Sequence, residues 1–314
     1  MLTSLLFFGA LLGPACTLQD AEIAPGQRDL TPMTLELGAD GESQMDPEVI
    51  VELASEARRA LAEGAGIKLP DGIPLVLLTM EEATQRRRAY TADLEDETGL
   101  TVAVDMLADL MFSDNMLGRY LPDEQVVYLI EDVIMKQGGD SDGPGQDLLF
   151  GVLAHELVHA YDDFMYDGVP DPRNLAVMLE DPSRMGEVQT HMALVEGRAT
   201  WAAELASIAA GREPLSAPTL ESTRSARYFE GDQGAGSEVV AGAGNAMVRL
   251  KLAQYAYGRL FAKAAWEFGR EPFFAEVFEH GPLSYAELED FNEFKMRWAE
   301  EQSEELDAAD DVDA

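Results

Sequence analysis

Two histidines and a glutamate stand together in the segment His155-Glu156-Leu157-Val158-His159. On a helix, each residue turns by about 100°, so His155 and His159 share one face, one turn apart. Imidazoles at that spacing can bind one Zn²⁺ ion at about 2.0–2.1 Å each. Glu156 then lies beside the first ligand, where its carboxylate can take a proton from activated water instead of binding the metal. The segment therefore predicts a hydrolytic zinc site with Glu156 as general base.

A catalytic zinc of this type needs a third protein ligand, which is sought among the acids downstream. Glu196 is the strongest candidate, because Gly197 and Ala199 follow it on a predicted helix and let a neighbouring backbone approach closely. His191 lies about 140° around the same helix from Glu196, so we interpret it as a core or surface histidine. The alternatives for the third ligand are Glu187, Glu204 and Glu180.

These two segments resemble the thermolysin-like gluzincin metallopeptidases, which join a zinc-binding HExxH helix to a glutamate on a second helix. The sequence is most similar to a bacterial group with HExxHA and EGxA motifs, here His155–Ala160 and Glu196–Ala199. Weaker likenesses at 116–123, 257–261 and 282–284 extend the resemblance over most of residues 70–290. The resemblance implies a zinc cofactor, a peptide or protein substrate, Glu156 as general base, and three metal ligands: His155, His159 and Glu196.

The chain departs from thermolysin in the surroundings of the metal ligands. Thermolysin carries an aspartate four residues after its ligand glutamate, where this chain has Thr200. The partner of a zinc histidine must then be another group, and the candidates are the hydroxyl of Thr200, Glu204 and Asp163. The longer gap between the two motifs predicts an inserted loop from Tyr166 to Pro182. Candidates for stabilising a developing oxyanion are Tyr255, Tyr257 and His280.

Capping signals and apolar periodicity predict the elements that must position these residues. Asp46-Pro47 provides an N-cap and a first-turn proline, while Thr79 and Glu82 form a capping box. The predicted helices cover about 47–63, 80–97, 147–165, 184–210, 237–268, 272–278 and 284–300. The predicted strands are 73–79, 115–120 and 126–130. The fold class is therefore α+β and mostly helical, with a small N-terminal sheet and a helical C-terminal part, as in zincin-like metallopeptidases.

The two ends of the chain differ in composition from this central domain at residues 46–300. Residues 1–15 contain the apolar run Leu2 to Leu12 and read as a signal peptide, and residues 16–45 as a flexible tether. Cys16 follows the apolar run and is the predicted site of lipid attachment to a membrane. Residues 301–314 are acidic and are predicted to be disordered. We therefore expect an exported protein, either a cell-surface lipoprotein or a secreted one.

Charge narrows the choice of partners. The formal net charge is −37, from 59 acidic and 22 basic residues, and such a field repels nucleic acid and anionic membrane surfaces. The sequence thus predicts an exported zinc-dependent metallohydrolase, a peptidase. The alternative is a non-catalytic, metal-binding surface lipoprotein that keeps the fold. The presence of Glu156 favours the enzyme, because a protein that only binds would not need a carboxylate there.

Overall fold

The computed structural model describes residues 33–38, 43–70, 72–100, 116–138, 144–166, 168, 172–181, 184–215 and 238–312. The predicted signal peptide and Cys16 lie outside these residues and stay predictions. One strand, β1 (Leu35–Leu37), falls inside the segment predicted to be a flexible tether. It is ordered there because its backbone pairs with a second strand, β2 (Leu75–Leu78).

The sheet has four strands in the order β1-β2-β4-β3. Strands β1 and β4 (Val126–Ile130) run parallel to β2, whereas β3 (Gly118–Leu121) pairs antiparallel with β4. The three strands predicted from sequence are therefore present, two of them as the expected hairpin. Strand β3 forms one edge of the sheet.

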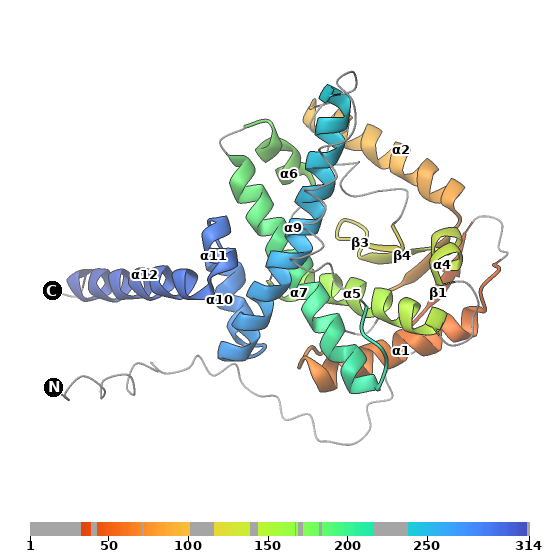
Figure 1. Cartoon of the computed structure of the whole chain (residues 1–314), viewed down its shortest axis with the longest axis horizontal. Coiled ribbons are helices and arrows are strands. Elements are labelled where there is room, and N and C mark those ends of the chain that lie inside the picture. The colour runs from red at the N-terminus through yellow and green to blue at the C-terminus, as the bar shows by residue number, and fades with distance from the viewer. Residues whose placement is uncertain are drawn as a thin grey trace. The chain divides into compact units, whose positions relative to one another are not determined.

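Helices account for most of the described residues, so the predicted α+β, mostly helical class is confirmed (Figure 1). Asp46 caps the first helix by accepting from Glu48 N, and Thr79 and Glu82 form the predicted capping box of the second. The helices are α1 (Pro47–Gly64), α2 (Met80–Thr98), α4 (Glu131–Gly138), α5 (Pro144–Tyr166), α6 (Pro172–Leu179), α7 (Met185–Ala210), α9 (Glu238–Gly269), α10 (Phe273–His280), α11 (Tyr285–Glu289) and α12 (Phe291–Val312).

Three stretches differ from the sequence-based expectation. Helix α4 was not predicted, and α6 lies inside the predicted inserted loop, with its own Leu175 and Ala176 buried against the rest of the protein. The single helix predicted over 284–300 is two helices, α11 and α12, because Asp290 between them has an extended backbone. Helix α12 then continues to Val312 through the tail predicted to be disordered. Acidic composition alone does not prevent a helix, since glutamate and alanine both favour one.

Apolar side chains from both faces of the sheet form the interior. One face packs on α1 and α5, and α7 completes that cluster from behind them; the other face packs on α2 and α4, and α6 completes the second cluster. A third cluster joins α7 to α9, α10, α11 and α12. Helix α5 therefore lies between the sheet and α7, and α7 in turn lies between α5 and α9. Among the described helices, none has the length and apolar content needed to cross a membrane.

The backbones of α7 and α9 touch where two glycines meet. A Cβ added at Gly197 would lie 1.9 Å from the carbonyl carbon of Gly258, and one added at Gly258 would lie 1.7 Å from the carbonyl oxygen of Ala193. Both distances are far below van der Waals contact, so neither position admits a side chain without moving a helix. The sequence predicted a close backbone approach at Gly197, and α9 is the helix that makes it.

Gly197→Ala is expected to destabilise the protein by about 1–3 kcal/mol or more, because the added methyl must separate the two helices. Gly186→Ala is the matched control: it is the same change on the same helix, and its new Cβ would meet nothing within 4 Å. The control should be neutral or stabilising by up to about 1 kcal/mol, since alanine favours a helix over glycine. Denaturant unfolding of both variants measures the difference, and equal shifts would contradict the proposed contact.

Candidate metal centre

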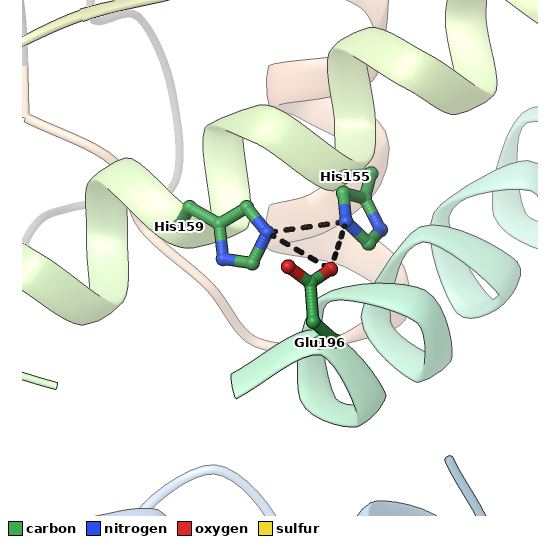
Figure 2. A group of neighbouring side chains, drawn as sticks. All are labelled: His155, His159 and Glu196. Atoms are coloured by element: carbon green, nitrogen blue, oxygen red, sulfur yellow. Dashed lines mark hydrogen bonds and ion pairs between the residues drawn. The ribbon is translucent and has the colours of Figure 1, made fainter. Parts of the chain in front are cut away.

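Helix α5 carries both histidines of the HExxH segment and is buried along most of its length. Its apolar side chains fill the core on either side of the histidine face; Leu149, Phe150, Leu153, Leu157 and Val158 are all buried. Helix α7 packs against this face and brings Glu196 to the two imidazoles. Figure 2 shows the three side chains pointing toward one another from the two helices.

The three potential ligand atoms form a nearly equilateral triangle. Nε2 of His155 lies 3.1 Å from Nε2 of His159 and 3.2 Å from Oε2 of Glu196, and the third side, from His159 Nε2 to Glu196 Oε2, is 3.6 Å. Ligands at about 2.0–2.1 Å from a tetrahedral Zn²⁺ ion are separated by about 3.3–3.4 Å. The triangle therefore fits three corners of such a tetrahedron and leaves the fourth for water or substrate.

The electrostatics of the triangle also favour a cation. Burial raises the pKa of Glu196, but hydrogen bonds and charge interactions with His155 and His159 outweigh burial and hold that pKa well below its ordinary value. Burial lowers the pKa of His159. Glu196 and Glu156 together raise that pKa by more than burial lowers it, so the net shift is upward. An ionised carboxylate and two imidazole nitrogens thus share one small buried volume, which suits a bound cation.

Glu156 lies beside the triangle and does not belong to it. The side chain is 7% exposed, and its Oε2 accepts a hydrogen bond from Tyr120 N at 2.7 Å. Strand β3 comes this close because Gly118 has no side chain; a Cβ there would lie 2.9 Å from Val152 Cγ1 and 3.2 Å from Glu156 Cγ. The strand thereby fixes the Glu156 carboxylate near the site, as a general base requires.

Two further side chains reach the triangle, and only one was among the sequence candidates. The hydroxyl of Tyr255 on α9 hydrogen-bonds to Glu196; burial, then the charges of Glu196 and Glu156, raise the pKa of Tyr255 well above its ordinary value. Arg119 on β3 was not predicted as a site residue; its Nη1 lies 3.9 Å from Glu196 Oε1. No spacing rule links Arg119 to Glu196, because only the packing of β3 on α5 brings them together.

The other candidate ligands and stabilisers lie elsewhere. Glu187 is exposed and pairs with Arg184, Glu204 accepts from Arg259 Nε at 2.7 Å, and Glu180 is exposed. His191 Nε2 donates to Gly168 O at 3.1 Å, and burial lowers its pKa, which fits its interpretation as a structural histidine. Tyr257 packs in the cluster between α7 and α9, while His280 contacts Glu276 and Glu301.

Comparisons with known proteins add little to this geometry. No protein-family model matches the chain, and no curated protein matches it. A solved structure from Chloroflexus aurantiacus, described as a "putative hydrolase with a novel fold", is similar at 18% sequence identity and a TM-score of 0.49. That similarity covers 81% of this chain and 92% of the other. It is too distant to support an argument about this site, which therefore stands on its own geometry.

The full-length protein is expected to bind one zinc ion per chain, and Glu196→Ala should abolish that binding, because two histidines alone offer too few donors. Glu187→Ala and Glu204→Ala are matched controls on the same helix, with carboxylates that point elsewhere, and should keep the metal. Metal analysis after dialysis against a zinc buffer measures the content. If Glu196→Ala retained zinc and one of the control variants lost it, the residue changed in that control would be the third ligand instead.

Proposed function

We propose that the protein is a zinc-dependent hydrolase, a peptidase of the gluzincin type, with His155, His159 and Glu196 as zinc ligands. The observation that carries this proposal is the triangle of ligand atoms with 3.1–3.6 Å sides, beside which β3 holds the Glu156 carboxylate. A site that only stored a metal would need the triangle but not the adjacent, fixed carboxylate. This combination favours the hydrolase over the non-catalytic lipoprotein.

The side chains divide the work of hydrolysis between them. When bound, a zinc ion supplies a Lewis acid that polarises the scissile carbonyl and promotes ionisation of water. Glu156 takes a proton from the attacking water as the new C–O bond forms, and passes it to the leaving nitrogen as the C–N bond breaks. The Tyr255 hydroxyl, which its raised pKa keeps protonated, would turn its single proton from Glu196 to the substrate and donate a hydrogen bond to the negative charge that develops on the carbonyl oxygen.

The edge of the sheet favours a peptide substrate. Strand β3 pairs with β4 on one side, and no described strand pairs with its other side. An extended peptide can add to such an edge through its backbone, and β3 contacts α5, the helix that carries the histidines. The apolar run Leu2 to Leu12 and Cys16 support the further proposal that the enzyme acts outside the cell, secreted or lipid-anchored.

Glu156→Gln keeps the size of the side chain and its hydrogen bond from Tyr120 N, but it cannot take a proton. Turnover is expected to fall by about 10²-fold or more while zinc content stays at one per chain. A peptide-library digest analysed by mass spectrometry, with and without a chelator, supplies the activity. Full activity in Glu156→Gln would remove Glu156 as the base. Wild-type cleavage that the chelator leaves unchanged would contradict the zinc mechanism itself.

Tyr255→Phe removes only the hydroxyl that faces Glu196. We expect kcat to fall by about 10²–10³-fold with zinc retained, the range seen when one oxyanion donor is deleted. Tyr257→Phe, on the same helix and directed into the cluster between α7 and α9, is the control and should keep kcat within about threefold. Steady-state kinetics on the best library peptide measure both. A Tyr255→Phe enzyme that changes KM alone would assign the hydroxyl to substrate binding.

A further inference from the structure

Two buried atoms on α5 lack hydrogen-bond partners, and they belong to neighbouring side chains. They are Nδ1 of His159 and Oδ2 of Asp162, and the described residues contain only two other such atoms. The residues are three apart and therefore lie on adjoining positions of one helix face. His159 is 4% exposed and Asp162 is 0% exposed, so water does not easily reach either atom. The two groups also interact electrostatically.

Metal binding through Nε2 decides where the proton of His159 must lie. A neutral imidazole carries one proton, and a ring whose Nε2 faces Glu196 and His155 as a ligand must carry that proton on Nδ1. A buried N–H group without an acceptor is costly, and metal-bound histidines almost always donate this proton to a carboxylate or carbonyl. His159 Nδ1 therefore requires an acceptor close to it.

The three partners suggested by the sequence are already engaged. Asp163 accepts from the hydroxyl of Tyr120 at 2.8 Å. Thr200 donates to the backbone oxygen of Glu196 at 2.7 Å, and Glu204 accepts from Arg259. Asp162 remains as a candidate: it is a buried carboxylate on α5, the helix that also carries His159, and its Oδ2 has no hydrogen-bond partner.

The Asp162 carboxylate is held in place from the opposite side. Arg198 Nε donates to Asp162 Oδ1 at 2.7 Å, and Arg198 Nη2 donates to both oxygens of Glu271 at 3.0 and 3.1 Å. Arg198 is 2% exposed and lies two residues after Glu196 on α7. One oxygen of Asp162 is thereby fixed, and the other is left for a different donor.

We propose that Asp162 is the positioning carboxylate of the metal centre: its Oδ2 accepts the Nδ1 proton of His159, and Arg198 holds it for that purpose. The contact fixes the imidazole tautomer and ring orientation, so that Nε2 presents its lone pair to the metal. The inference rests on the proposed zinc site. Asp162 touches neither metal nor substrate and acts only through His159.

The first test compares zinc affinity in the full chain for Asp162→Asn and Asp163→Asn, by competition with a chromophoric chelator. Asp162→Asn should weaken zinc binding by about 10–100-fold, the range for loss of such a partner. Asp163→Asn is the matched control, an identical change one residue along, and should stay within about threefold. Because Asp162→Asn also weakens the contact with Arg198, unfolding of both metal-free variants is measured, and affinity is referred to the folded fraction.

The second test is independent of any loss of stability. In wild-type protein labelled with ¹⁵N-histidine and loaded with zinc, His159 should show a protonated Nδ1 in a hydrogen bond that exchanges slowly with water. Asp162→Asn should shift this signal and Asp163→Asn should not. A rapidly exchanging or unprotonated Nδ1 in the wild type overturns the proposal, even if Asp162→Asn does not fold.

The outcomes separate this inference from the proposed function. Wild-type protein that binds no zinc overturns both. Zinc binding that depends on Glu196 but is equal in Asp162→Asn and Asp163→Asn overturns only the role of Asp162. A weaker affinity in Asp162→Asn, together with the shifted His159 signal, supports the positioning role, because a purely structural residue would alter stability and leave that signal unchanged.

Discussion

Three potential metal ligands meet at one buried point in this protein, and the surrounding structure holds them there. Two imidazole nitrogens and an ionised carboxylate oxygen stand 3.1–3.6 Å apart in a buried place. Without a cation between them, their lone pairs repel wherever a shared proton does not intervene. The helices that carry them must therefore be fixed by contacts outside the triangle.

On α7, the two residues that follow Glu196 make those contacts, so three consecutive residues have three different sets of partners. Successive residues on a helix point about 100° apart. Glu196 points to the histidines of α5, Gly197 lies against the backbone of α9, and Arg198 reaches Asp162 of α5 and Glu271. The glycine contact fixes the distance between α7 and α9, while the buried arginine fixes the rotation of α7 against α5. Tyr255 reaches Glu196 because it lies one turn from Gly258, at the same helix crossing.

The sequence predicted the parts of the site that depend on local geometry. Helical spacing alone predicted that His155, Glu156 and His159 lie together at one site. Gly197 beside Glu196 indicated where a backbone could approach. Glu196 could only be ranked above Glu187 and Glu204, because the facing residue on α7 depends on how that helix is rotated in its packing. Capping residues likewise predicted the starts of α1 and α2, as such signals act within one turn.

Features that depend on distant contacts were beyond reach from the sequence. Strand β1 forms because its backbone finds β2, and α6 forms because its apolar face is covered by α2 and α7. Arg119 enters the site because β3 packs on α5, and Asp162 differs from Asp163 only in which neighbour each one meets. A one-residue step on a helix turns a side chain by about 100°, so the sequence shows that the two aspartates face different ways but not which of them faces Arg198.

The balance of buried charge gives a reason for the arrangement as a whole. The acidic and basic side chains at the triangle and in the adjoining network include four carboxyl groups and two guanidinium groups: Glu156, Glu196, Asp162, Glu271, Arg119 and Arg198. The acidic groups outnumber the basic ones by two, and the raised pKa of His159 shows that a proton on its ring offsets part of this excess when no metal is bound. Burying uncompensated charge is costly, and only a partner of opposite sign offsets the cost. A cation bound at the triangle would supply that compensation without a proton on His159, so the buried charge around the three ligand atoms is consistent with the proposed metal site.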